Sequence, residues 1–359
     1  MTQTQRTSNQ RVALLGYGLG GACFHAPLIA ATPGLRLTTV VTRDAGRRAQ
    51  ALREHPGVRI VEDAAVLWAN PSGHDLVVVT TPNRTHASLA MDAIEAGLPV
   101  VVDKPFARTV AEGQAVIDAA RARSVLVSAY HNRRWDAELL TLRRLLDEAV
   151  LGRVLRFESR LERWRPQLKG GWRESAQTED AGGLLYDLGS HLIDQALVLF
   201  GPVAHVYAEL DRRRPDLEVD DDVFLALTHT SGVRSHLWAS AVAAQQAPRM
   251  RVLGERGAFV KQDADLQEPA LRAGERPQGP EWGEEPPERW GTLYDGSKEI
   301  RVPSERGAFQ QFYIQIASAL RDGSPPPVDA ADALAGLAII EAAQRSAVER
   351  RIIEIPQDA

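Results

Sequence analysis

The sequence predicts an α/β protein that combines a doubly wound parallel sheet with a second α/β domain, which contains a large, open, mostly antiparallel sheet. Two patterns predict this fold class. Between residues 11 and 130, short aliphatic runs alternate with helical stretches, and from residue 152 the apolar residues recur with a period of two. The length of 359 residues favours two domains, and we expect them to comprise residues 1–130 and 131–359.

Composition and charge exclude several classes of protein. Hydrophobic residues make up 44% of the chain and charged residues 25%, as in ordinary globular proteins. The net charge of −5 gives no basic excess for nucleic acid, and Cys23, the single cysteine, excludes an internal disulfide and a cysteine-rich zinc site. The apolar runs are too short to span a bilayer and the first ten residues are polar. We therefore expect a cytoplasmic protein that binds neither nucleic acid nor membrane.

Six aliphatic runs predict the strands of the first sheet. They are short and lack polar alternation, as is typical of strands that are buried on both faces. The stretches between them, such as residues 47–55 and 86–97, have the length and composition of helices. The runs are residues 12–15, 37–41, 58–61, 76–79, 100–102 and 125–127.

The first run leads directly into a glycine-rich turn. Gly16, Gly18 and Gly21 fit the pattern G-x-G-x-x-G, with Leu19 and Gly20 between them. After the first strand of a βαβ unit, this pattern indicates a Rossmann dinucleotide site rather than a plain tight turn. The glycines allow a tight turn, close approach of a pyrophosphate and close packing of the next helix, whose N-terminus favours an anion.

The end of the second run bears on the choice of cofactor. Thr42 stands at the expected strand tip and Arg43 follows it. A hydroxyl and a guanidinium suit a 2′-phosphate, so we expect NADP. Asp44 leaves NAD open, because a small shift in register would make it the ligand of the ribose 2′-hydroxyl.

Polar residues follow the later strands. Ligands of open α/β sheets bind outside the carboxyl ends of the strands, so these residues are candidates for a binding site. The alternative for the lysine among them is a surface side chain at a strand exit. The candidates are Thr81, Pro82, Asn83, Lys104, Asn132 and Arg133.

The remaining sequence predicts a helix, an antiparallel sheet and two closing helices. Residues 137–150 form an amphipathic helix pattern, and in the next strand Leu155, Phe157 and Leu161 alternate with charged residues. The outer face carries Arg, Glu, Tyr and Trp, so it is either solvated or a dimer contact. Further strands are expected at residues 205–211, 223–230, 233–239, 250–253 and 258–261, an irregular excursion at 267–290, and helices at 306–321 and 330–349.

A predicted helix at residues 187–200 carries a stripe of short polar side chains. Asp187, Ser190, His191, Asp194 and Gln195 fall on one arc of about 140° at 100° per residue. The stripe lacks Lys, Arg and Glu, the long residues that usually solvate a helix, which favours a functional face over an ordinary wet one. A third ligand with suitable spacing is lacking, so we expect no metal site.

These motifs together resemble the glucose–fructose oxidoreductase / inositol dehydrogenase / rhizopine-catabolism (Gfo/Idh/MocA) family of NAD(P)-dependent oxidoreductases over almost the whole chain. Asp103 stands where the family usually has glutamate. Residues 24–29, 131–136 and 186–188 resemble a branch that includes NADP-dependent scyllo-inositol dehydrogenases. The family likeness rests on residues 16–21 and 25–27, on Thr81-Pro82-Asn83 with His86, on Asp103-Lys104-Pro105, and on residues 187–191 with Asp194.

The resemblance implies that Lys104, Asp187 and His191 form the catalytic set. A histidine suits proton transfer from a hydroxyl, and a lysine ammonium stabilises alkoxide character at the same oxygen. The aspartate can orient the histidine or hold a neighbouring hydroxyl. Besides these three residues, we expect the substrate to contact Asn132, Arg133, Trp164, Arg165 and Asp194. The expected cofactor contacts are Gly16, Gly18, Leu19, Gly20, Gly21, Thr42, Arg43, Thr81, Pro82, Asn83, His86 and Lys104.

We therefore expect an NADP-preferring dehydrogenase that transfers a hydride between the nicotinamide and a secondary alcohol or ketone of a cyclic polyol or sugar. The resemblance also implies a homodimer or larger even-numbered homo-oligomer built on the open sheet. The alternatives are a reductase of another aldose or keto-sugar, an NAD-dependent glycosidase, and a non-catalytic cofactor-sensing regulator, which would need neither Lys104 nor His191.

Overall fold

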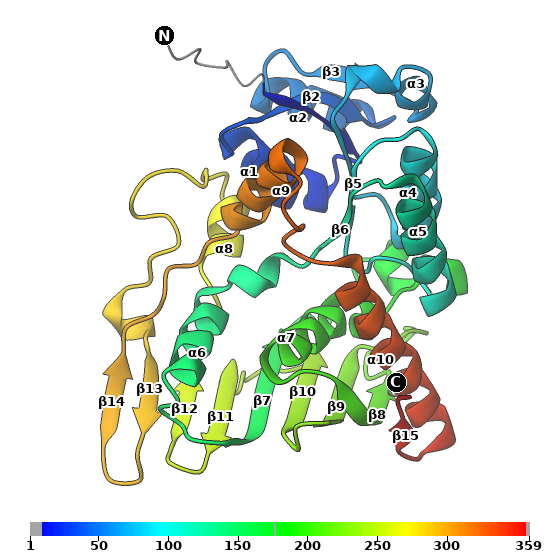
Figure 1. The fold of residues 1–359 in the computed structure, drawn as a ribbon. Coiled ribbons are helices and arrows are strands. Elements are labelled where there is room, and N and C mark those ends of the chain that lie inside the picture. Colours follow the sequence, from blue (N-terminus) through cyan, green and yellow to red (C-terminus); the bar gives the residue numbers. More distant parts are fainter. Residues whose placement is uncertain (1–8, 176, 357–359) are drawn as a thin grey trace.

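A computed structural model describes residues 9–175 and 177–356 of the chain, which form two sheets with helices packed against them (Figure 1). The first sheet has six strands, all parallel, in the spatial order β3-β2-β1-β4-β5-β6. The strands are β1 (Gln10–Leu15), β2 (Leu35–Val41), β3 (Arg59–Val61), β4 (Leu76–Val79), β5 (Val100–Asp103) and β6 (Val127–Tyr130). This confirms the doubly wound parallel sheet.

The sixth strand begins later than the sequence predicts. Val125 closes the preceding helix instead, since its N–H donates to the carbonyl oxygen of Ala120 at 2.9 Å, and the carbonyl oxygen of Leu126 accepts the N–H of Val100 at 2.9 Å. The three valines of β5, like most of β4, are fully buried, which explains their unbroken apolar character. The helices of this half are α1 (Ala26–Ala31), α2 (Ala45–Glu54), α3 (Ala65–Trp68), α4 (His86–Glu95) and α5 (Val110–Arg123).

The second sheet has nine strands in the order β14-β13-β12-β11-β7-β10-β9-β8-β15. Its pairs are antiparallel except for β7 and β10, which run parallel. The mostly antiparallel sheet is thus confirmed. Its strands are β7 (Val154–Glu162), β8 (Val203–Asp211), β9 (Asp222–His229), β10 (Arg234–Ser240), β11 (Met250–Gly254), β12 (Ala258–Lys261), β13 (Gly291–Tyr294), β14 (Glu299–Val302) and β15 (Ile353–Glu354).

Helices α6 (Ala137–Asp147), α7 (Ser190–Phe200) and α10 (Ala330–Glu349) lie over one face of the nine-stranded sheet (Figure 1). The other face carries partly exposed side chains that pack on each other. The guanidinium of Arg160 lies 3.9 Å from the ring centroid of Trp238, and the Trp238 ring packs on Phe224 at 5.1 Å. Leu155 was expected on the buried face, but it is the second residue of β7 and is 44% exposed.

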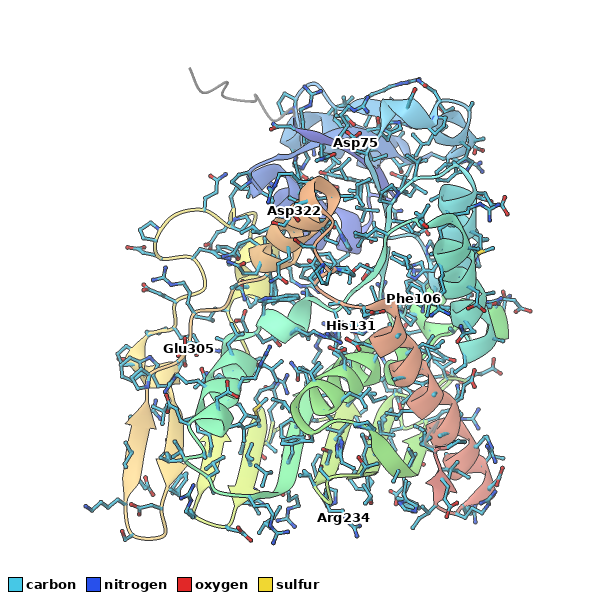
Figure 2. All side chains as sticks on the ribbon, in the orientation of Figure 1. Asp75, Phe106, His131, Arg234, Glu305 and Asp322 are labelled. Atoms are coloured by element: carbon cyan, nitrogen blue, oxygen red, sulfur yellow. The ribbon has the colours of Figure 1, made fainter. Side chains whose placement is uncertain are left out.

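Two helices near the C-terminus contact the half of the chain that contains the parallel sheet. Helix α9 (Gln310–Asp322) contacts α1, and α10 contacts α5 and β6. The Tyr313 hydroxyl lies 2.6 Å from Nδ1 of the fully buried His25. Phe106 and His131, which follow β5 and β6, lie between the two sheets (Figure 2). A domain boundary after residue 130 stays a prediction. The excursion predicted at residues 267–290 contains a short helix, α8 (Gln267–Arg272).

Candidate active site

The glycine-rich turn after β1, residues 16–21, is here called the glycine cradle. Of its three motif glycines, only Gly18 has free space where a side chain would stand. Gly16 has a φ of +97°, and a Cβ on it would lie 2.7 Å from the carbonyl oxygen of Thr80. A Cβ on Gly21 would lie 2.3 Å from the carbonyl oxygen of Gly16. Near Gly18, by contrast, the closest atom to such a Cβ is Nη1 of Arg47, at 3.8 Å. Two glycines are therefore required by packing, and the space beside Gly18 fits the phosphates of a dinucleotide.

The tip of β2 places three polar residues beside this cradle. Thr42 is buried, and the exposed Arg43 guanidinium forms an ion pair with Asp63 at 2.7 Å. The Asp44 carboxylate caps α2 by accepting the backbone N–H of Arg47 at 2.8 Å. This cap uses one oxygen of the carboxylate that the sequence left open as a ribose ligand. Arg47 was missed, although an arginine in the first turn of the helix after β2 is visible in the sequence.

Lys104 and Asp187 meet in a cavity of about 330 Å³ between the two halves of the chain. The Lys104 ammonium donates to Oδ1 of Asp187 at 2.8 Å and to its backbone oxygen at 2.6 Å. Burial disfavours ionisation of Asp187, but Lys104 and Arg173 outweigh it and hold the pKa of the carboxyl well below its usual range. The pair is therefore ionic.

His191 lines the same cavity and is 7% exposed. Its Nδ1 has no hydrogen-bond partner among the described residues. Burial, and then the positive charges of Lys104 and Arg133, lower the pKa of the imidazole well below 6.5. His191 is therefore neutral near pH 7, and its unpartnered Nδ1 is buried. The Asp187 carboxylate contacts Lys104 and Arg173, so the expected orientation of His191 by Asp187 is not seen.

The polar stripe divides into two groups. Asp187, in a π-helical turn (Leu185–Gly189) before α7, and His191 line the cavity. Ser190 instead donates to the carbonyl oxygen of Tyr186 at 2.7 Å, and Gln195 accepts from Arg249 at 2.9 Å. The prediction that Asp194 contacts substrate needs correction, because its buried carboxylate is bound by Arg134 at 2.6 Å, outside the cavity lining.

Only some of the other residues that were predicted to contact the substrate line the cavity. Asn132, Arg133 and Arg165 line the cavity, whereas Trp164 lies outside the lining and is 56% exposed. Trp172 lines it instead. Sequence reasoning did not single out Arg163, Lys169 or Glu268 as site residues, although all three line the cavity.

The side chains of His86 and Asn83 bind backbone carbonyl groups and do not line the cavity. The buried His86 ring has Nδ1 2.8 Å from the carbonyl oxygen of Pro105 and Nε2 2.8 Å from that of Thr81. Asn83 donates its amide to the carbonyl oxygen of Ala181 at 3.1 Å. The expected cofactor contact of His86 is therefore corrected: both ring nitrogens are engaged, and the ring ties together the segments that follow β4 and β5.

Two kinds of feature are absent from the described residues. Within residues 9–175 and 177–356, no group of three or more His, Cys, Asp or Glu side chains could hold a metal ion. Across that same part of the chain, each helix is too short or too polar to cross a membrane.

Family models match both halves of the chain. Residues 10–131 match the model described as the NAD-binding Rossmann fold of an oxidoreductase family. Residues 143–355 match the C-terminal alpha/beta domain of an oxidoreductase family.

The chain is similar over nearly its whole length to individual proteins. It is 36% identical to scyllo-inositol 2-dehydrogenase (NADP(+)) IolW of Bacillus subtilis, covering 96% of this chain and 95% of that protein. It is 37% identical to the uncharacterized oxidoreductase YdgJ of Escherichia coli, covering 96% and 98%. The solved structure of yvaA from Bacillus subtilis superposes with a TM-score of 0.92 at 34% identity, covering 98% of this chain and 100% of that one.

Proposed function

Because the chain belongs to the Gfo/Idh/MocA family of oxidoreductases and is a dehydrogenase of CH–OH groups with a nicotinamide cofactor, we propose that it oxidises a secondary alcohol of a cyclic polyol or sugar with NADP. The observation that carries the proposal is the ionic Lys104–Asp187 pair beside neutral His191. These side chains lie in the cavity that Leu19 and Gly20 of the glycine cradle also line.

Oxidation of a secondary alcohol removes a hydride from carbon and a proton from oxygen. A nicotinamide cofactor, when bound, would supply the hydride acceptor, or the hydride donor in the reverse direction. A neutral His191, which lines the cavity, can accept the hydroxyl proton. The Lys104 ammonium can stabilise negative charge on the same oxygen, and Asp187 holds that ammonium in place.

NADP is proposed over NAD on the residues around the tip of β2. Arg43 and Arg47 supply two guanidinium groups there, and Thr42 supplies a hydroxyl. Asp44, the one carboxylate that could bind a ribose 2′-hydroxyl from this loop, is engaged as the helix cap. The name of the relative IolW, which includes NADP(+), agrees with this choice.

We further propose that residues 131–359 contribute most substrate contacts and that the outer sheet face joins two copies of the chain in a homodimer. Half-buried aromatic and charged side chains such as Trp238 and Arg160 on that face support the assembly.

The test is a spectrophotometric screen of the purified chain against inositols and aldoses with NADP and with NAD, and against their keto forms with NADPH and with NADH. Reduction of NADP by at least one polyol or sugar supports the proposal. Binding of NADPH without turnover of any compound in the screen contradicts it, as does cleavage of a glycoside without net reduction of added cofactor.

A further inference from the structure

The cavity is richer in positive charge than a neutral substrate requires. Eight Lys and Arg residues line it, against five Asp and Glu residues. An uncharged polyol binds through hydroxyl groups, which both donate and accept hydrogen bonds. Such a substrate would leave the excess positive charge of the cavity uncompensated. The excess therefore bears on which polyol or sugar the site accepts.

The carboxylates present are shared among several cations. Glu268 contacts the guanidinium groups of three arginines, Arg133, Arg163 at 3.8 Å and Arg272 at 2.8 Å. Asp187 is shared by Lys104 at 2.8 Å and Arg173 at 3.4 Å. Arg133 also pairs with the buried Asp136 at 3.4 Å. Three cations therefore face two carboxylates around Glu268, and two cations face one around Asp187, so both clusters remain positive.

Two further cations belong to the cavity lining. Arg165 and Lys169 line the cavity, and neither forms an ion pair with a carboxylate in the part of the chain that the structure describes. Together with Arg163 we call them the cationic rim. All three lie in or next to the segment that follows β7, whereas the glycine cradle follows β1.

Backbone hydrogen bonds hold the rim against the rest of the fold. The Arg163 N–H donates to the carbonyl oxygen of Ser240 at 2.8 Å, and the Arg165 N–H to that of Ala241 at 2.7 Å. The Lys169 N–H donates to the carboxylate of Glu174 at 2.8 Å, which also pairs with Arg214 at 3.0 Å. These anchors fix the segment beside the cavity.

We propose that the cationic rim binds an anionic substituent, a carboxylate or a phosphate, on the polyol or sugar whose hydroxyl reacts at Lys104 and His191. This inference rests on the proposed function and narrows its substrate class. Guanidinium and ammonium groups form charge-assisted hydrogen bonds with both anions. Burial, together with repulsion by Arg165 and Arg133, lowers the pKa of Arg163, and a bound anion would relieve that repulsion.

The test compares matched neutral and anionic substrates with the full chain and NADP. The carboxylates are D-glucuronate and D-galacturonate, the phosphates are D-glucose 6-phosphate and myo-inositol 1-phosphate, and the neutral compounds are D-glucose, D-galactose, myo-inositol and scyllo-inositol. We expect kcat/KM for at least one anion to exceed that of its neutral counterpart roughly tenfold or more, the scale of a hydrogen bond between charged groups. Added salt should reduce this preference.

The double variant R165Q/K169Q should lower the preference for the anion about tenfold by the same reasoning. Its circular dichroism and NADPH affinity should match those of the native protein, because the cofactor phosphates bind at the cradle. K298Q, which removes an exposed lysine from the turn between β13 and β14, is the matched control and should keep the native preference.

The substrate panel distinguishes a carboxylate from a phosphate and tests whether an anionic group is bound. Preference for the uronates identifies a carboxylate, and preference for the phosphate esters identifies a phosphate. Turnover of neutral compounds at rates equal to or above those of their anionic counterparts overturns the inference and leaves the proposed function standing. Binding of NADPH with no turnover of any compound overturns both.

Discussion

The side chain of Lys104 forms a half-buried ion pair with Asp187, whose Oδ1 lies 2.8 Å from the lysine Nζ although the residues are 83 positions apart in the sequence. Lys104 directly follows β5 of the parallel sheet, and Asp187 lies in the turn before α7, which covers the second sheet. The reacting end of the cavity is thus assembled from both halves of the chain.

Asp187→Asn should weaken the interaction that positions the Lys104 ammonium, because it removes the charge of residue 187 and leaves its hydrogen-bonding oxygens. We expect kcat/KM for the polyol or sugar to fall roughly tenfold, the scale of one charge-assisted hydrogen bond, with NADPH affinity unchanged. Steady-state kinetics and fluorescence titration measure the two quantities. Asp216→Asn, on an exposed loop, is the control. Turnover of the Asp187 variant within twofold of native would show that the pair is not used in the reaction.

The pH dependence of kcat/KM should reflect the lowered pKa of His191. The imidazole must be neutral to accept a proton, so activity is lost as the pH falls through its pKa. Because burial and the neighbouring cations lower that pKa, the acid limb should lie below pH 6.5. A profile measured between pH 5 and 9 tests this. An acid limb at or above pH 6.5 is incompatible with a buried, neutral His191 as the base.

Arg43→Ala should weaken binding of NADPH by roughly 1–3 kcal/mol and leave NADH nearly unchanged, because only the former carries a 2′-phosphate. The ion pair with Asp63 is exposed and competes only weakly for the guanidinium. Arg36→Ala, which removes an exposed charge from the opposite end of β2, serves as the control. Equal losses for both cofactors, or tighter binding of NADH by the native protein, would refute the preference for NADP.

The native chain should have the mass of a dimer, or of a larger even-numbered oligomer, by light scattering at micromolar concentration. Trp238→Glu should shift it toward the monomer, because it places a charge at the centre of the proposed contact and removes the stacking with Arg160. A monomeric mass for the native chain would remove this proposal.

The strands of the parallel sheet could be predicted because each is a compact aliphatic run, and the glycine turn has a fixed spacing. β13 and β14 could not. They are short, and they follow a segment rich in proline and glutamate that shows no alternation. Their position depends on pairing with β12, which the sequence does not encode locally.

The site was predicted less completely for a related reason. Asp194 shares a helix with His191, but its partner is Arg134, 60 positions away. Periodicity places both residues on one face of the helix and cannot tell which of them a distant arginine neutralises. Lys104 could be singled out because a strand end and a following proline mark it, whereas Glu268 and Lys169 lie in segments without periodicity.

The most direct test of the active site is the turnover of His191→Asn with the substrate that the screen identifies. We predict a loss in kcat/KM on the order of 10²–10⁴, the usual range for a positioned acid–base group, with native folding and NADPH affinity. His205→Asn, a partly exposed histidine on β8 outside the cavity lining, should keep native turnover as the control. A correctly folded His191 variant that binds NADPH and turns over within a few-fold of native would contradict the assignment of this cavity as the active site.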